Sequence, residues 1–176
     1  MSNRAIWRAD TVLARQAQDE EMQTTLKRIA EMTGGRDFAP ASSANLGDLF
    51  AQIRAFTRGE TTSFNQSNFL ARNGTIDYKV AVAPRSESLT VVPSWSGSAI
   101  DTTLISPAGR SIKARELAPP AGRYIKGDTY EIIQVDKPVG GVWQIRLSWA
   151  IPPDNADGER VNLTVSEKSD VSVNLL

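Results

Sequence analysis

The sequence predicts a chain of the α+β class, in which a short helical segment precedes an antiparallel β-sandwich of about seven strands. Over roughly the first 58 residues, apolar side chains recur at spacings of three and four, which is the period of a helix. From about residue 75 they recur at every second position, which is the period of a strand. Clusters of Gly, Pro, Ser and Asn separate the later segments, with no helical pattern between them.

Two helices are expected in the first part. The first places Met22, Leu26 and Ile29 on one face, and it ends at residues 33–35 (TGG), because glycine readily adopts the left-handed conformation of a helix cap. The second follows the capping run 42–45 (SSAN) and closes at residues 58–59 (RG). Its apolar stripe consists of Leu46, Leu49, Phe50, Ile53 and Phe56. Short strands are expected at residues 10–14 and 37–39.

The second part predicts the strands of the sandwich. Residues 75–82 alternate cleanly, whereas residues 89–95 do so less cleanly, and Pro93 indicates an edge strand or a bulge there. The other expected strands are 102–106, 130–135, 142–149, 161–165 and 171–175. We expect the alternating residues Trp143, Ile145, Leu147 and Trp149 to form a buried face.

These patterns divide the chain into three parts. Residues 1–58 carry the helical segment and residues 75–176 form the sandwich. We expect residues 59–74 to be a linker, because the run Thr61–Asn68 is polar and shows no period.

Charge and composition argue against several classes of function. The 20 Lys and Arg side chains balance the 20 Asp and Glu, so we expect neither nucleic-acid binding nor attraction to an anionic membrane. The sequence has no cysteine and no histidine, so a Ser-His-Asp or Cys-His site cannot be assembled from it. No apolar run is long enough to span a bilayer, and we expect no membrane insertion. We therefore expect a chain that is not an enzyme and needs no cofactor.

A helix that ends in Thr-Gly-Gly is followed by a short strand and a second amphipathic helix, in residues 26–35 (LKRIAEMTGG), 36–38 (RDF) and 45–53 (NLGDLFAQI). This succession resembles the end of a von Willebrand factor A (VWA) domain. The resemblance covers roughly residues 9–57. It implies that residues 1–58 are the C-terminal remnant of a VWA-like α/β domain.

The resemblance is incomplete. A full VWA domain begins with a strand carrying Asp-x-Ser-x-Ser, whose side chains bind a divalent cation, and that motif is absent from this sequence. No metal ligand is therefore carried over to any residue here. The remnant is expected to pack on the sandwich, on another copy of the chain or on upstream sequence.

The sandwich part also carries a resemblance. Residues 103–109 (TLISPAG) and 138–147 (PVGGVWQIRL) are similar to the β-rich region that follows VWA domains in bacterial surface proteins and chloride-channel-regulator-like proteins. The same pairing of a Ser-Pro-x-Gly turn with a Gly-x-Trp strand is found in proprotein-convertase P-domains. All these relatives are non-catalytic modules that hold or stabilise a neighbour.

Few residues are candidates for a site. An oxygen-rich loop could bind Ca²⁺, although it lacks the EF-hand glycine and the final glutamate, and its residues are Asp154, Asn155, Asp157 and Glu159. The acidic run 19–21 (DEE) is better explained as a favourable helix start. The tryptophans Trp95, Trp143 and Trp149 would bind glycans only if exposed, and core positions are the more frequent reading.

The resulting expectation is a non-catalytic protein-interaction or structural module from a larger VWA-containing adhesion or assembly protein. Its partner would be another protein or an upstream domain of the same chain. The alternatives are a P-domain-like accessory domain that stabilises a hydrolase, and a glycan-binding β-sandwich. We expect an extracytoplasmic or cell-surface location, with a cytoplasmic one as the alternative.

Overall fold

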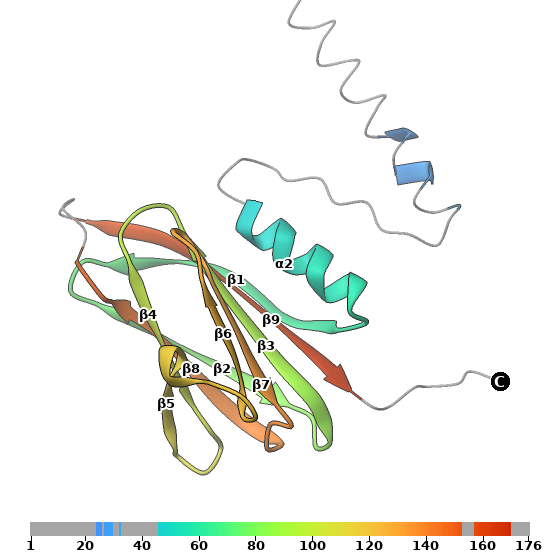
Figure 1. Ribbon diagram of the computed structural model, residues 1–176. Helices are drawn as coiled ribbons and strands as arrows, with labels where there is room; N and C mark the ends of the chain where they lie inside the picture. The colour runs from blue at the N-terminus through green and yellow to red at the C-terminus, as the bar shows by residue number, and fades with distance from the viewer. Residues whose placement is uncertain (1–23, 26, 30–31, 33–45, 153–156, 170–176) are drawn as a thin grey trace, which may run out of the picture. The chain divides into compact units, whose positions relative to one another are not determined.

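The computed structural model describes residues 24–25, 27–29, 32, 46–152 and 157–169 (Figure 1). The chain divides into two compact units, residues 1–41 and residues 42–176. The described residues of the first unit are helical, in agreement with the predicted first helix. The predicted strands at 10–14, 37–39 and 171–175 lie outside the described residues. The second unit contains the helix α2 (Leu46–Thr57) and the strands.

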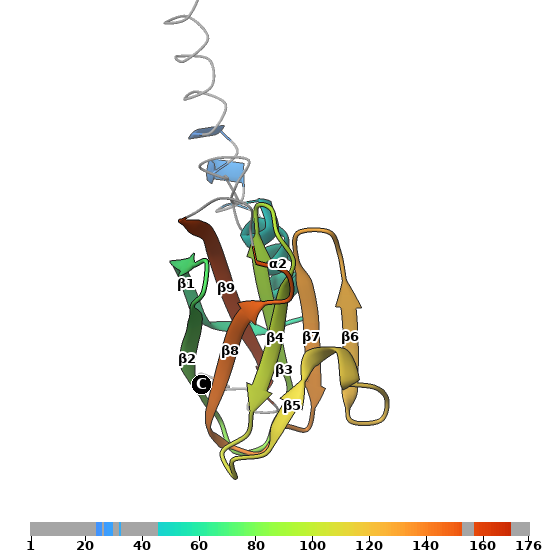
Figure 2. The same ribbon diagram turned by 90° about the vertical axis from the view of Figure 1, so that its left-hand side faces the viewer.

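Two antiparallel sheets make up the second unit. The larger sheet has the order β1 (Thr61–Ala71), β9 (Gly158–Ser169), β3 (Ser86–Trp95), β7 (Glu131–Asp136) and β6 (Gly122–Lys126). The smaller has the order β2 (Thr75–Val82), β8 (Gly141–Trp149), β4 (Ile100–Ile105) and β5 (Ser111–Lys113). A 3-10 turn, η2 (Ala114–Glu116), joins β5 to β6 and so carries the chain from one sheet to the other (Figure 2). The β-sandwich prediction is confirmed.

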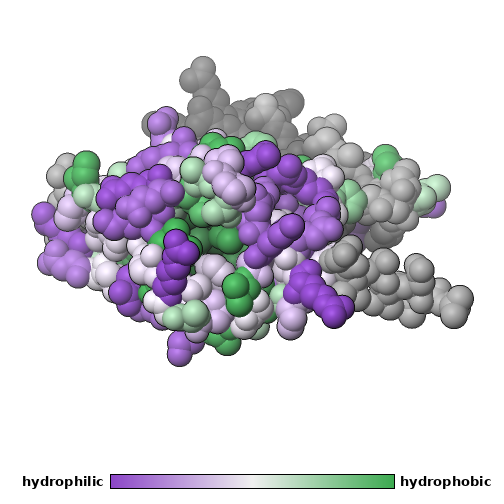
Figure 3. All heavy atoms as spheres, turned by 60° about the horizontal axis from the view of Figure 1, so that its bottom comes forward, coloured by the Kyte–Doolittle hydropathy of each residue, from purple (hydrophilic) through white to green (hydrophobic). Residues whose placement is uncertain are grey.

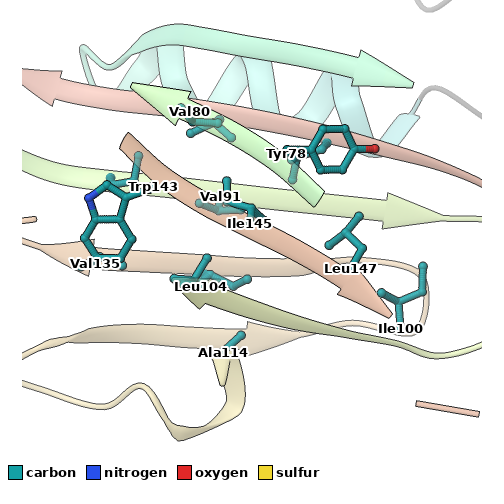
Figure 4. Packing of buried hydrophobic residues seen from close by; sticks show 14 of the residues in the cluster. Tyr78, Val80, Val91, Ile100, Leu104, Ala114, Val135, Trp143, Ile145 and Leu147 are labelled. Carbon is teal, nitrogen blue, oxygen red and sulfur yellow. The ribbon is translucent and has the colours of Figure 1, made fainter. Parts of the chain in front are cut away.

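The interior of the sandwich is built from alternate residues of facing strands. Figure 4 shows side chains such as Val91 and Val135 of the larger sheet gathered with Leu104 and Ile145 of the smaller one. The predicted face on β8 is confirmed for Trp143, Ile145 and Leu147, while Trp149 is half-buried at its end. Each fully buried side chain of this size contributes about 1.5–3 kcal/mol through removal from water.

Residues 61–71 form a strand where the sequence indicated a linker. β1 pairs with β9 along nearly its whole length, and of its side chains only Leu70 is fully buried. As an edge strand it exposes most of its residues, so its sequence carries no alternating apolar pattern. The short strands β5 and β6 lacked a pattern for a similar reason, because few of their residues are buried.

Pro93 lies on a central strand and not on an edge. β3 is flanked by β9 and β7, and Pro93 pairs with Leu163 of β9. On the other side, the regular ladder with β7 stops at the pair Val91–Ile133, and pairing resumes only at the isolated bridge between Ser94 and Tyr130. Proline has no N–H to donate, so it interrupts the ladder on one side while the strand stays central.

Helix α2 lies against the outer face of the larger sheet, where it contacts β1, β9 and β3 (Figure 1). Its bounds agree with the sequence prediction, but the buried face does not. Ala51 and Ala55 are buried, whereas Phe50 and Phe56 of the predicted stripe are exposed. The small side chains of these alanines allow the helix backbone to approach the sheet closely. The sequence placed this helix in a separate domain, whereas in the structure α2 belongs to the same compact unit as the sandwich.

A buried ion pair fastens this helix to the sheet. The Arg54 guanidinium donates to both Glu60 oxygens at 2.9 and 3.1 Å, and the Glu60 side chain is only 3% exposed. Glu60 also accepts hydrogen bonds from Ser166 Oγ at 2.5 Å and Thr90 Oγ1 at 3.4 Å. Burial lowers the pKa of Arg54 and the Glu60 carboxylate opposes that shift.

Within the described part of the chain, no helix has the length and apolarity needed to cross a membrane.

Replacing Arg54 tests how much this ion pair holds the helix. We expect Arg54→Met to lower the free energy of unfolding by about 3 kcal/mol, because the Glu60 carboxylate would stay buried without its cation. Chemical denaturation measures the change. The control is Glu87→Gln, which removes the exposed Lys168–Glu87 pair and should cost less than about 1 kcal/mol. Equal losses in the two variants would contradict a structural role for the buried pair.

Candidate functional site

The predicted calcium loop is only partly within the described residues. Asp154 and Asn155 lie outside them. Glu159 accepts hydrogen bonds from the backbone N–H of Ser98 at 3.1 Å and from its hydroxyl at 3.2 Å, so its carboxylate ties β9 to the loop before β4. Asp157 is exposed just before β9, and the described residues contain no cluster of three or more metal-ligating side chains. Calcium binding at this loop stays a prediction.

The tryptophans are core residues in the described structure. Trp95 and Trp143 are buried, and the Trp143 indole donates to the Val139 carbonyl at 2.8 Å. Trp149 is half-buried and donates to the Ala71 carbonyl at 2.8 Å. These three rings therefore provide no exposed platform for stacking a sugar. The acidic run at 19–21 lies outside the described residues.

A polar pocket lies between the two sheets, beside η2 at the edge formed by β5 and β6. Its volume is about 220 Å³. The side chains that matter for its chemistry come from β4, β5, η2, β6 and β7, and they are Asp101, Thr102, Lys113, Arg115, Tyr124 and Glu131. On the face shown in Figure 3 hydrophilic residues predominate, with a strip of hydrophobic atoms among them.

Glu131 is the buried acid of this pocket. It opens β7 and shares the inward-facing side of that strand with Ile133 and Val135, and it is only 1% exposed. One carboxylate oxygen, Oε1, accepts a hydrogen bond from the Tyr124 hydroxyl at 2.7 Å. The other oxygen, Oε2, has no hydrogen-bond partner among the described residues. Such a carboxylate oxygen is costly to bury unless a donor reaches it.

Thr102 faces the same pocket from the opposite sheet. It sits between Ile100 and Leu104 on the inward side of β4 and is 2% exposed. Its hydroxyl has no hydrogen-bond partner among the described residues. Two inward positions, one in each sheet, thus carry polar groups where the neighbouring positions carry aliphatic ones. A single ligand group between them could satisfy both.

Charged side chains surround the opening of the pocket. Arg115 and Asp101 form an ion pair at 3.7 Å, and their side chains are 56% and 38% exposed. Lys113 lines the same opening. Lys126 lies opposite Glu131 in the β6–β7 register, yet its side chain is exposed and forms no ion pair with Glu131 in the described structure. The opening is therefore accessible to solvent, whereas Glu131 Oε2 and Thr102 Oγ1 are buried.

Sequence reasoning did not find this pocket, although a signal was present. In the predicted strand 130–135, residues 131, 133 and 135 share one face, so Glu131 is a charged residue on an otherwise apolar side. A polar residue at a core position departs from the binary pattern, and such departures mark functional or strained sites. Thr102 in the opposite sheet could not be inferred as its companion, because the packing of one sheet on the other is a tertiary feature that the sequence pattern does not contain.

A second surface feature is an apolar groove beside α2. It has a volume of about 360 Å³, and the side chains that line it are Phe50, Ala51, Arg54, Val92, Tyr130 and Ile132. Phe50 is 66% exposed at its edge. Apart from Arg54, which is paired with Glu60, and Tyr130, the side chains that line the groove are apolar.

Comparisons with known proteins leave the family open. No protein-family model matches the chain, and no curated protein matches it. Among solved structures, a Bacillus licheniformis lipase in its propeptide form is similar over 61% of this chain and 22% of its own, at 18% identity and a TM-score of 0.44. A periplasmic inhibitor of g-type lysozyme from Aeromonas hydrophila is similar over 63% of this chain and 90% of its own, at 16% identity and a TM-score of 0.41.

A third solved structure is a family 29 carbohydrate-binding module in complex with cellulohexaose. It is similar over 63% of this chain and 77% of its own, at 16% identity and a TM-score of 0.32. The chain spans about a fifth of the length of the lipase. These likenesses are too low to assign a function, so the functional argument rests on the pocket.

Replacing Thr102 tests whether its hydroxyl is unsatisfied in the free protein. We expect Thr102→Val to raise the free energy of unfolding by about 1 kcal/mol, because valine has nearly the same shape and removes a buried hydroxyl that lacks a partner. Thermal or chemical denaturation without added ligand measures the change. A loss of stability would show that the hydroxyl makes a stabilising contact in the free protein.

The Tyr124 hydroxyl makes stability depend on alkaline pH. Burial raises the pKa of Tyr124 above its ordinary value, and its hydrogen bond to Glu131 raises it further. Because the folded pKa exceeds the unfolded one, this stabilisation is complete below about pH 10 and decreases as the pH rises beyond the unfolded value.

Tyr124→Phe should therefore make the loss of stability above about pH 10 shallower. Denaturation curves at increasing alkaline pH measure this difference. Parallel curves for Tyr124→Phe and the unmodified protein would contradict the burial of this hydroxyl.

Proposed function

We propose that the chain is a non-catalytic binding module and that the pocket between β4 and β7 is its ligand site. The observation that carries this proposal is the Glu131 carboxylate, which is held through one oxygen by Tyr124, while no group of the described residues bonds the other oxygen. Buried carboxylates in proteins are normally fully hydrogen-bonded. A core acid that is positioned on one side and unsatisfied on the other is typical of a site prepared for a ligand.

The chemistry of the pocket supports binding rather than catalysis. The sequence supplies no histidine and no cysteine as base or nucleophile. Among the described hydrogen bonds of the pocket, the Tyr124 hydroxyl is the one side-chain hydroxyl that donates to a carboxylate, that of Glu131. Its raised pKa makes that phenol a poor nucleophile at neutral pH.

The wider setting is also a proposal. The resemblance of residues 9–57 to the end of a VWA domain favours a piece of a larger adhesion or assembly protein at the cell surface or outside the cytoplasm. The packing of α2 on the sandwich fits one of the arrangements expected for such a remnant. The alternative is an accessory domain that stabilises a hydrolase in the manner of a P-domain.

A protein-interaction module is the second candidate function. The observation that favours it is the apolar groove beside α2, with Phe50 exposed at its edge. A partner that presents one large apolar side chain would fill this groove and cover Phe50. Phe50→Ser would then abolish partner binding without changing the polar pocket.

The binding proposal is tested with isotope-labelled protein and a library of small polar molecules that includes sugars, amines, amino acids and carboxylic acids. We expect at least one of them to shift the backbone amide resonances of residues 102 and 131. Glu131→Leu should abolish these shifts, because it removes the acceptor, whereas Glu87→Gln should retain them. The proposal fails if no molecule shifts these resonances, if Glu131→Leu binds as well, or if the bound molecule is converted to product.

A further inference from the structure

We infer that the ligand of this pocket is neutral and rich in hydroxyl groups, and that its recognised element is the vicinal diol of a single sugar ring. This inference rests on the proposed function, since it names the ligand class of the same pocket. It follows from three properties of the lining: its charge balance, its pattern of donors and acceptors, and its size.

The charge balance disfavours an ionic ligand. Two acids, Asp101 and Glu131, and two bases, Lys113 and Arg115, line the pocket. A cation drawn to Glu131 would pass the two bases at the opening, and an anion drawn to the bases would meet the buried carboxylate. A neutral polar molecule avoids both repulsions and the cost of burying a second charge.

The pattern of hydrogen-bonding groups requires a ligand that both donates and accepts. Among the described residues, Glu131 Oε2 is an acceptor without a donor, and Thr102 Oγ1 on the facing strand is a hydroxyl without a partner. A ligand hydroxyl can donate to the carboxylate and accept from the threonine. A second hydroxyl on the adjacent carbon can then bond the groups at the opening, where Lys113 and Arg115 donate and Asp101 accepts.

The size of the pocket limits the ligand to about one ring. Its volume of about 220 Å³ lies below the range of roughly 300–1,000 Å³ that is usual for drug-sized ligands. The partly exposed Asp101 and Arg115 leave the opening accessible, so a terminal residue of a longer glycan could enter while the rest stays outside. Stacking on tryptophan, the usual signature of sugar binding, is not needed for such an end-on mode.

An internal occupant is the strongest competing explanation. Lys126 lies opposite Glu131 in the sheet register, and a change of rotamer would bring its ammonium toward the carboxylate. The exposed position of Lys126 argues against this, since a fixed ion pair would bury its stem. The variant Lys126→Met separates the two explanations, because it removes the internal cation and leaves the lining of the pocket unchanged.

The experiment is a nuclear magnetic resonance titration with five probes: the methyl glycosides of glucose, galactose and mannose, and n-butylammonium and cyclohexanol. We expect at least one methyl glycoside to shift the amides of residues 102 and 131, and neither butylammonium nor cyclohexanol to do so. Glu131→Gln and Thr102→Val should each weaken glycoside binding by at least about tenfold, as expected for loss of a hydrogen bond to a buried group. Lys126→Met and Glu87→Gln should bind as the unmodified protein does.

Three results would overturn the inference, and they differ in what they say of the proposed function. Binding of butylammonium alone would replace the sugar with a cationic ligand and leave the binding module intact. Glycoside binding by Lys126→Met but not by the unmodified protein would make Lys126 the natural occupant. If none of the five probes binds any variant, the diol inference fails, and the library screen decides whether the pocket binds at all. Glycerol, added as a sixth probe, distinguishes a general polyol site from one shaped for a ring.

Discussion

The structure depends on one constraint: two sheets share a single apolar interior, so each strand must turn alternate side chains inward. This constraint fixes the register of β8 against β2 and β4, and it places Ile133 and Val135 of β7 in the same buried cluster as Leu104 and Ile145. Polar residues at inward positions are exceptions to this alternation and therefore indicate a special local role. Where Thr102 and Glu131 take inward positions, a pocket lined by residues of the surrounding strands lies beside the apolar interior. The same alternation of inward side chains that builds the core also places Thr102 and Glu131 at the pocket.

The sandwich unit shows two ways to bury a carboxylate. Glu60, beneath α2, accepts hydrogen bonds from the Arg54 guanidinium and from two hydroxyl groups, so both of its oxygens have partners and it attaches the helix to the sheet. Glu131 accepts one hydrogen bond, from the Tyr124 hydroxyl, and its second oxygen has no partner in the part of the chain that the structure describes. Stability alone would favour an aliphatic residue at position 131, as at 133 and 135. An acid at this position fits the proposed site, because functional sites commonly exchange some stability for binding.

The sequence allowed the sandwich, the second helix and most core strands to be predicted, because their apolar residues repeat with a clear period. β8 is the clearest case, with three consecutive inward residues confirmed. The edge strand β1 and the short strands β5 and β6 were missed, since few of their residues are buried and no period remains. The buried face of α2 was misassigned because helical spacing reports apolar stripes and not which stripe meets the sheet. The sequence pattern alone showed Glu131 as a charged residue on the apolar face of β7. Tyr124 is brought near it by the pairing of β6 with β7, and Thr102 by the packing of the two sheets on each other.

The most direct test of the account is a high-resolution crystal structure of the protein, grown without polyols and then soaked in the methyl glycoside that binds best. The account predicts that a ring hydroxyl lies within hydrogen-bond distance of both Glu131 Oε2 and Thr102 Oγ1, with Lys126 in solvent before and after soaking. A side chain of Lys126 or Arg115 seated on the Glu131 carboxylate, unchanged by the soak, would contradict it.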